Sequence, residues 1–131
     1  IGLTNTLALE GVRKGIRANT IAPVAGSRLT ETILPKEVTE ALKPELVTPL
    51  VIRLCSEHSE ENGSVFEVGA GWVAKLRWER SQGALFNPSE ELTAEAIDAA
   101  WEQIGDFTDA EHPSSAQDTF SRVFDNLGIK M

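Results

Sequence analysis

The chain has 131 residues, a formal net charge of −8 and a single cysteine, Cys55. This length suits about one domain, and one cysteine excludes an internal disulfide. No uncharged apolar run is long enough to span a bilayer, and no basic patch points to nucleic acid. The acidic excess lies in residues 87–131, which hold ten acidic and two basic side chains. Such acidic helices usually confer solubility and nothing more.

The first elements are expected to be a helix and a strand. Apolar residues share one face of residues 1–11, which predicts a helix that continues from upstream and stops at Gly11. An apolar run with β-branched residues then predicts a buried parallel strand over residues 16–22. Pro23 should end this strand, because proline cannot donate a hydrogen bond to a sheet.

The middle of the chain is expected to hold two helices and a second strand. Apolar residues at helical spacing predict helices over residues 33–42 and 45–56. Pro49 is the weak point of the second helix, because it removes a backbone donor. Cys55 lies on the apolar face of that helix, so we expect it in the core. Turn residues then lead to a predicted strand over residues 64–68.

Two more helices are expected in the tail. Thr93 and Ser115 are suitable N-caps, and apolar residues follow each at intervals of three and four. Gly128 is expected to end the last helix. The apolar stripes of both helices must pack on something, and we expect them to lie on the rest of the protein near a subunit interface.

Taken together, these elements predict an α/β fold. Two apolar strands separated by helices are typical of a parallel sheet, but two strands are too few for a stable one. We therefore expect the C-terminal portion of a larger, doubly wound parallel sheet. Its domain should cover residues 1–86, and an acidic helical extension should cover residues 87–131. An autonomous fold of this length is the less favoured alternative.

The loop after the first predicted strand is the candidate ligand site. In open α/β sheets, ligands bind just past the carboxyl ends of strands. Pro23 and Gly26 fix a turn here, and small side chains allow a flat ring to approach the backbone. Ser27 and Thr30 can form hydrogen bonds with an amide or a phosphate. An ordinary strand-to-helix connection would have a similar composition, so both interpretations stay open.

A second glycine motif follows the second predicted strand. Residues 69–74, Gly-Ala-Gly-Trp-Val-Ala, match the pattern G-x-G-x-x-A of dinucleotide-binding loops. That loop requires a helix and then another strand, whereas charged and aromatic residues and chain-breaking Gly83 and Pro88 follow here. A simple glycine turn is therefore favoured. His58 and His112 have no partner at ligand spacing, so no metal site is expected.

The order of these motifs resembles the C-terminal third of the short-chain dehydrogenases/reductases. The resemblance begins with helix, Asn-x-Ile-Ala-Pro strand and threonine-containing loop, and continues with Asn-Gly before a strand that ends in Gly-Ala-Gly. It is closer still to one branch of the family. The segments that carry this closer resemblance are 19–30, 41–45, 60–63, 71–80 and, in the tail, Trp101, Asp106-Phe107 and Pro113.

This resemblance implies a Rossmann-like domain and a redox activity. Members of that branch oxidise (3R)-hydroxyacyl-CoA to 3-ketoacyl-CoA with NAD in peroxisomal fatty-acid β-oxidation, and homodimers are expected. The residues that the resemblance assigns to cofactor binding are Pro23, Val24, Ala25, Gly26, Ser27 and Thr30. The family's catalytic serine and its Tyr-x-x-x-Lys motif have no counterpart in this chain, and we expect them upstream of Ile1.

Three hypotheses from different classes follow. The favoured one is a fragment of an NAD-dependent hydroxyacyl-CoA dehydrogenase. The second is a non-catalytic interaction or dimerisation module derived from such an enzyme. The third is a small nucleotide-binding domain that uses the glycines of residues 69–71. The chain ends in Ile129-Lys130-Met131, which is not a peroxisomal Ser-Lys-Leu signal, so a peroxisomal location is expected from the resemblance alone.

Overall fold

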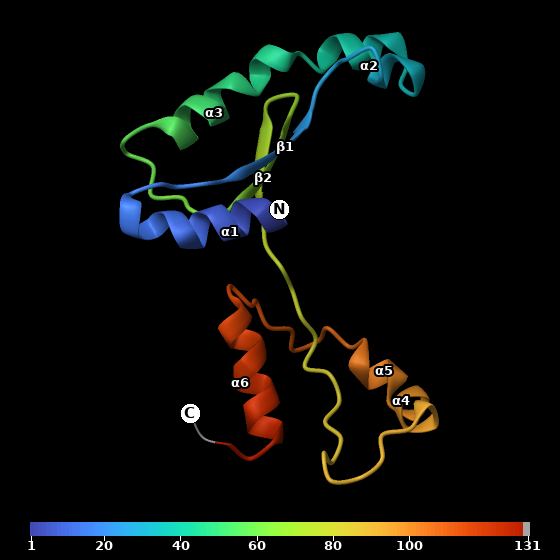
Figure 1. Ribbon diagram of the computed structural model, residues 1–131. Helices are drawn as coiled ribbons and strands as arrows, with labels where there is room; N and C mark the ends of the chain where they lie inside the picture. The colour runs from blue at the N-terminus through green and yellow to red at the C-terminus, as the bar shows by residue number, and fades with distance from the viewer. Residues whose placement is uncertain (130–131) are drawn as a thin grey trace. The chain divides into compact units, whose positions relative to one another are not determined.

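The computed structural model describes residues 1–129, which form two compact units (Figure 1). The first unit is Ile1–Arg77, and the second begins at Trp78. Residues 78–86 therefore belong to the second compact unit, while the proposed domain boundary after residue 86 stays a prediction. Lys130 and Met131, the last two residues of the C-terminal tripeptide Ile129-Lys130-Met131, lie outside the described residues.

The first helix ends at Gly11, as the sequence predicts, and a 3₁₀ turn follows it. Helix α1 covers Gly2–Gly11 and continues into a 3₁₀ turn, η1, at Val12–Lys14. Gly11 itself keeps right-handed geometry, with φ of −76°, and Gly15, with φ of 67°, takes the left-handed conformation that ends the 3₁₀ turn. Gly11 instead permits close packing, because a Cβ atom there would lie 2.8 Å from the carbonyl oxygen of Ile16.

Strand β1 contains the proline that was expected to end it. It covers Thr20–Val24, later than the predicted 16–22, and pairs in parallel with β2, Val65–Gly69. The Thr20 amide donates to the carbonyl of Ser64 on the β2 side at 2.8 Å. Because donors alternate along a strand, the nitrogen of Pro23 faces away from β2, toward the side of β1 on which no strand lies within residues 1–129. The predicted parallel pairing is confirmed.

The sheet within this chain has a third strand, which the sequence pattern did not predict. Strand β3, Trp72–Leu76, runs antiparallel to β2 and gives the order β1-β2-β3. Ala70 and Gly71 join the two strands, with φ of 49° and 85°. Two consecutive positive φ values are typical of a tight hairpin turn whose twist matches that of its strands. The glycine motif is therefore the turn of a β-hairpin.

The helical segments between β1 and β2 are shorter than predicted. Two 3₁₀ turns and two helices stand in place of the two expected helices. In chain order they are η2 at Thr30–Thr32, α2 at Lys36–Ala41, η3 at Pro44–Leu46 and α3 at Thr48–Cys55. Pro35 is the N-cap of α2, and Pro49 lies in the first turn of α3, where its missing N–H has no helical partner to lose. In Figure 1, α1 and α3 lie on opposite sides of the strands.

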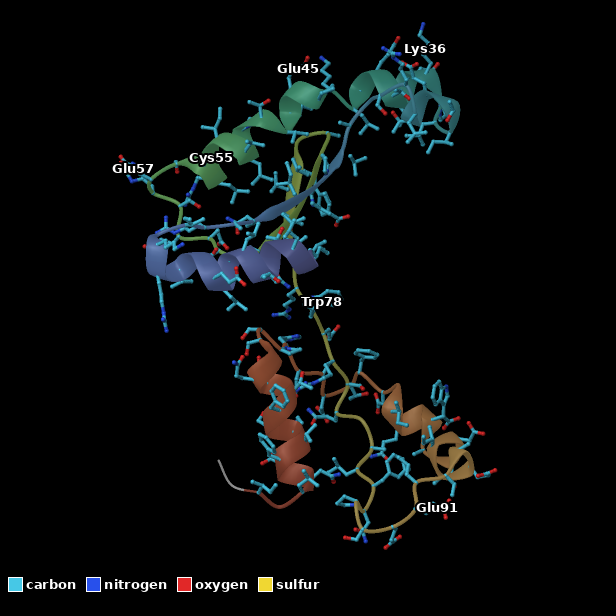
Figure 2. The ribbon with its side chains drawn as sticks, in the orientation of Figure 1. Lys36, Glu45, Cys55, Glu57, Trp78 and Glu91 are labelled. Atoms are coloured by element: carbon cyan, nitrogen blue, oxygen red, sulfur yellow. The ribbon has the colours of Figure 1, made fainter. Side chains whose placement is uncertain are left out.

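Few apolar side chains of the first unit are fully buried. Among the described residues the buried apolar ones are Ala8, Leu42 and Val68, and Val68 is at the centre of the sheet. Cys55 was expected in the core, but it is exposed at the end of α3 (Figure 2). Leu50 and Leu54 on the apolar face of α3 are half-buried, but no residue of the helix is fully buried within residues 1–129, so periodicity alone placed Cys55 wrongly.

The second unit begins its helical part at the predicted cap. Helix α4 covers Ala94–Ala99, and the hydroxyl of Thr93 accepts a hydrogen bond from the Ala96 amide at 3.2 Å. The helix does not continue as expected, because Ala100 departs from helical geometry with φ of −99° and ψ of 5°. A separate turn of helix, α5, follows at Trp101–Ile104.

The last helix, α6, covers Ala116–Asn126 and is capped at both ends. The carboxylate of Asp118 accepts hydrogen bonds from the amides of Ser114 and Ser115 at 2.7 and 2.9 Å, and these bonds lower the pKa of Asp118. At the other end Gly128 has φ of 68°, and the Ile129 amide donates to the Phe124 carbonyl at 2.9 Å. The predicted end at Gly128 is confirmed.

A charged cluster holds α6 to the extended segment that opens this unit. Arg80 and Glu111 exchange backbone hydrogen bonds of 2.9 and 2.8 Å, and their side chains form an ion pair at 2.8 Å. Arg122 on α6 also pairs with Glu111.

None of the helices described over residues 1–129 combines the length and the apolar composition needed to cross a membrane.

Candidate functional site

The candidate loop leaves the sheet where two parallel strands end together. Val24, the last residue of β1, lies opposite Gly69, the last residue of β2. A Cβ atom on Gly69 would lie 2.7 Å from the carbonyl oxygen of Val24, so the two backbones are in close contact. Loops at this edge of an α/β sheet are where ligands are usually bound.

The six residues assigned to cofactor binding lie in one continuous stretch, as expected for neighbours in the chain. Pro23 and Val24 are the last two residues of β1, and Thr30 is the first residue of η2. The three between them, Ala25, Gly26 and Ser27, belong to the loop that joins the two elements. Their assignment to cofactor binding remains a proposal.

Reciprocal hydrogen bonds between Ser27 and Thr30 shape the loop. The Thr30 hydroxyl accepts from the Ser27 amide at 2.6 Å and donates to the Ser27 carbonyl at 2.8 Å. The Ser27 hydroxyl accepts from the Thr30 amide at 3.3 Å, and the two hydroxyl oxygens lie 3.2 Å apart. With the Thr30 proton on the Ser27 carbonyl, the Ser27 hydroxyl can donate either to the Thr30 oxygen or to a ligand.

This donor set fits a primary carboxamide such as that of nicotinamide. A carboxamide presents one carbonyl acceptor and an NH₂ group with two donors. The Ser27 hydroxyl can donate to that carbonyl, and the Thr30 oxygen retains a lone pair that can accept from the NH₂ group. Ala25 adds only a methyl group beside the backbone of this loop, which allows a flat ring to approach it.

Gly26 fastens this loop to α2. Its amide donates to the carbonyl of Leu42 at 2.6 Å. A Cβ atom at this position would lie 2.6 Å from the carbonyl oxygen of Thr39 and 3.1 Å from that of Leu42. Only glycine permits this approach of two backbones, because a distance below 3.0 Å forces one of them to shift.

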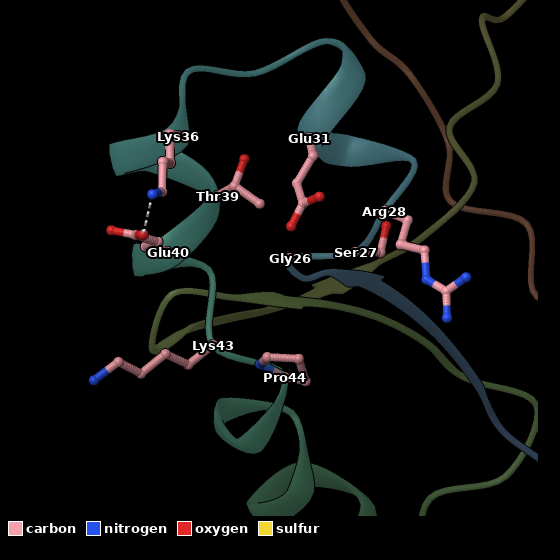
Figure 3. A pocket seen from close by; sticks show the side chains of 9 residues that line it. All are labelled: Gly26, Ser27, Arg28, Glu31, Lys36, Thr39, Glu40, Lys43 and Pro44. Atoms are coloured by element: carbon pink, nitrogen blue, oxygen red, sulfur yellow. Dashed lines mark ion pairs between the residues drawn. The ribbon is translucent and has the colours of Figure 1, made fainter.

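A cavity of about 580 Å³ lies between the loop and α2 (Figure 3). Nine residues line it, five of them charged: Gly26, Ser27, Arg28, Glu31, Lys36, Thr39, Glu40, Lys43 and Pro44. Figure 3 shows the carboxylate of Glu31 turned into the cavity and the guanidinium of Arg28 turned away from it. Lys36 and Glu40 form an exposed ion pair at 3.6 Å.

Sequence reasoning found the loop but missed this cavity. Its charged residues come from η2, α2 and the segment before η3, and no short motif connects them. They meet because Gly26 brings the loop onto the end of α2. The glycine was recognised as a turn residue, whereas its role in packing becomes visible only in the fold.

The other candidate motifs do not form ligand sites. The glycines of residues 69–71 lie at the end of β2 and in the turn of the hairpin, and β3 stands where a dinucleotide-binding loop needs a helix. This geometry removes the basis of the hypothesis of a small nucleotide-binding domain. Among residues 1–129 no three His, Cys, Asp or Glu side chains gather as a metal site would require.

Several known proteins are similar to this chain in sequence and in structure. The chain is 52% identical over 128 residues to the peroxisomal multifunctional enzyme type 2 of Mus musculus, covering 97% of this chain and 17% of that enzyme. The solved structure of the full-length peroxisomal multifunctional enzyme type 2 from Drosophila melanogaster matches 97% of the chain with a TM-score of 0.83 and 35% identity. The match covers 23% of that chain.

A smaller relative links the fold to short-chain dehydrogenases. The crystal structure of a short chain dehydrogenase from Mycobacterium avium matches 79% of the chain and 35% of its own length, with a TM-score of 0.59 and 31% identity. No protein-family model matches the chain. The chain thus spans about a fifth of the multifunctional enzymes it matches, and it has the α/β fold of part of a Rossmann domain. Over nearly its whole length, the chain is a close homologue of one segment of the peroxisomal multifunctional enzymes type 2, and it resembles the short-chain dehydrogenases.

Proposed function

We propose that the chain forms the C-terminal section of an NAD-dependent (3R)-hydroxyacyl-CoA dehydrogenase. The complete protein would oxidise (3R)-hydroxyacyl-CoA to 3-ketoacyl-CoA in fatty-acid β-oxidation. The observation that carries this proposal is the 52% identity to the mouse multifunctional enzyme over 97% of the chain. The fit of the Ser27 and Thr30 hydroxyls to a carboxamide supports the choice of a nicotinamide cofactor.

In this proposal the chain's own residues bind and orient rather than transfer protons. The cofactor, when bound, accepts a hydride. Pro23 to Ser27 would cover one face of the nicotinamide ring, and Ser27 and Thr30 would fix its carboxamide. Fixing the ring in one orientation favours the reaction, because productive geometry is reached without a further loss of entropy. The acid–base groups of the family have no counterpart in residues 1–131 and must be supplied from outside this chain.

The location and assembly of the complete protein follow the same resemblance. Relatives from mouse, slime mould and two fungi are all named as peroxisomal enzymes, which supports a peroxisomal location. We also propose that the complete protein is a homodimer. The exposed apolar side chains Phe120 and Val123 of α6, and Leu127 just after it, would then pack against the dehydrogenase core near the subunit interface.

The activity of the complete protein tests this proposal directly. The protein that contains this chain would be purified and supplied with a (3R)- or a (3S)-3-hydroxyacyl-CoA, together with NAD or NADP. Formation of the reduced nicotinamide would be followed by its absorbance. We expect oxidation of the (3R) thioester with NAD and none of the (3S) thioester. If neither enantiomer is oxidised, the proposal fails and the alternative of a non-catalytic interaction module is favoured.

A further inference from the structure

We propose that Thr20 is a positioning residue for the oxidation, because its hydroxyl fixes the place of α1 along β1. The turns of this helix that precede Ile1 would carry the acid–base groups, and the position of the helix along β1 decides where those turns lie relative to the cofactor loop. This inference rests on the proposed function, which assigns the acid–base groups to a part of the complete protein outside residues 1–131.

Helix α1 and strand β1 lie side by side and run in opposite directions (Figure 1). The hydroxyl of Thr20, the first residue of β1, donates to the hydroxyl oxygen of Thr4 on the helix at 2.7 Å. The carboxamide of Asn62 donates to the Ala8 carbonyl and accepts from the Ala18 amide, each at 3.0 Å. Thr4 is therefore level with Thr20, and Ala8 is level with Ala18.

These two contacts define one alignment of the helix with the strand. The four residues from Thr4 to Ala8 rise about 6 Å along the helix, and two residues of extended chain span about the same length. Val24, at the end of β1, lies about 13 Å beyond Thr20, a length that the helix covers in about nine residues. The helical position level with the cofactor loop thus falls about six residues before Ile1.

Apolar packing does little to fix α1 along its axis. Among the described residues of the helix, only Ala8 and Gly11 are buried. Ala8 lies against Gly63, where a Cβ atom would be 3.5 Å from that of Ala8, whereas Leu3 and Leu9 are exposed. Such small residues allow close approach but interlock weakly. Hydrogen bonds weaken when distance and angle depart from their optimum, so the polar contacts hold the alignment.

Thr20 controls the half of α1 that is nearer to the site. Asn62 holds the helix at Ala8, one turn farther from the cofactor loop. Without the Thr20 hydroxyl, the helix can pivot at Asn62. A displacement at Thr4 is then about threefold larger at the turn before Ile1, because that turn lies about three times as far from Ala8. A reacting group displaced by about 1 Å can lower the rate about a hundredfold.

Threonine variants of the complete protein test the inference. Thr20→Val keeps the branched shape and lacks the hydroxyl, whereas Thr20→Ser keeps the hydroxyl. We expect Thr20→Val to lower kcat for the (3R) thioester at least about tenfold, with the KM of the thioester and the Kd of NADH unchanged, and Thr20→Ser to retain kcat. The control Thr6→Val removes an exposed hydroxyl of α1 that donates to the Gly2 carbonyl at 3.2 Å, and it should leave kcat unchanged.

The pH profile of kcat separates positioning from a loss of folded protein. A base beside the cationic nicotinamide of the oxidised cofactor has a lowered pKa, and moving that base away raises it. The rise of kcat with pH should therefore shift to higher pH in Thr20→Val, whereas a smaller folded fraction lowers kcat equally at every pH. Thr4→Val removes the acceptor of the same bond and should give the same shift, and the double variant should be no worse than either single one.

Hydrogen exchange in α1, followed by mass spectrometry, gives a readout that does not depend on activity. We expect Thr20→Val to speed exchange of the α1 amides and Thr6→Val to leave it unchanged. An unchanged kcat and pH profile in Thr20→Val, or an equal loss in Thr20→Val and Thr20→Ser, would overturn the inference even in an active dehydrogenase. If the complete protein oxidises neither thioester but exchange still rises only in Thr20→Val, the proposed function fails, whereas the hold of Thr20 on α1 stands.

Discussion

At the scale of single residues, Gly26 couples the cofactor loop to α2. Replacing it by alanine would place a methyl group 2.6 Å from the carbonyl oxygen of Thr39, so the loop or the helix must move. We expect Gly26→Ala to destabilise the complete protein by about 1–3 kcal/mol, the usual cost of overpacking, as measured by denaturant unfolding.

Gly2→Ala is the matched control for that change. Nothing lies within 4 Å of a Cβ atom at Gly2, and alanine is the better helix former on α1. The control should be neutral or slightly stabilising. Equal stability of the Gly26 and Gly2 variants would contradict the close packing of loop and helix.

Thr30 organises the same loop through its hydroxyl. Thr30→Ala removes the acceptor of the Ser27 amide and the donor to the Ser27 carbonyl. We expect NAD to bind the complete enzyme more weakly by about 1 kcal/mol, the net value of one hydrogen bond. Thr30→Ser keeps the hydroxyl and should retain the affinity. Unchanged NAD affinity and turnover in the alanine variant would count against the assigned site, and fluorescence titration with NADH makes the comparison.

Sequence reasoning was most successful where one residue determines the local geometry. Thr93 caps α4 with its own hydroxyl, and Gly128 ends α6 in a left-handed conformation. Both roles follow from the side chain, or its absence, and need no tertiary contact. Cys55 was misplaced because its burial depends on what covers α3, which the periodicity of one helix does not reveal.

At the scale of elements, Glu61 links the segment before β2 to β3. Its carboxylate accepts hydrogen bonds from the Lys75 ammonium at 2.7 Å and from the Ser64 hydroxyl at 2.6 Å. The bond from Lys75, followed by that from Ser64, holds the pKa of Glu61 below its usual value. A carboxyl whose folded-state pKa is depressed stabilises the fold above its unfolded-state pKa. That contribution is lost as the pH falls through the folded-state value.

A pH series on the complete protein tests this link. We expect the free energy of unfolding of the wild type to fall more steeply with acidification below the usual glutamate pKa than that of Glu61→Gln, because the variant has no proton to take up. Glu10→Gln, a matched change at an exposed position of α1, should keep the slope of the wild type. Identical slopes for the wild type and the Glu61 variant would show that the contact adds no stability.

Elements whose pairing depends on distant residues were predicted less well. The parallel pairing of β1 and β2 was expected from apolar runs separated by helices, and it is present. Strand β3 was not predicted because charged Lys75 and Arg77 follow closely on Trp72 and Val73. Apolar and polar residues therefore do not alternate clearly along this segment. The signal that could have revealed it is the two-residue Ala70-Gly71 turn between β-branched segments, which favours a hairpin over a nucleotide-binding loop.

At the scale of the whole molecule, the chain exposes much apolar surface. Its accessible surface is 10265 Å², whereas a compact monomer of 14.2 kDa exposes about 6,800 Å² by the usual scaling with mass. Large apolar side chains are exposed in both units, among them Leu3, Ile33, Ile52, Trp78, Leu85 and Trp101. Such extensive exposed apolar surface is expected of a segment that packs against further protein.

The chain expressed by itself should therefore be poorly folded. We expect residues 1–131 alone to aggregate or self-associate, to bind a hydrophobic dye and to unfold without a sharp transition, since three strands and few buried apolar residues provide little cooperativity. Scanning calorimetry and analytical ultracentrifugation make the measurement. A soluble monomer with a sharp, cooperative thermal transition would show that the chain is an autonomous domain.

The central claim is that the loop from Pro23 to Thr30 holds the nicotinamide of a hydroxyacyl-CoA dehydrogenase. The most direct measurement is a structure of the complete protein with NAD and a 3-ketoacyl-CoA bound. The account predicts the nicotinamide ring against the backbone of Pro23 to Ser27, and its carboxamide within hydrogen-bond distance of Ser27 or Thr30. A nicotinamide bound elsewhere, with this loop free of contact to the cofactor, would contradict it.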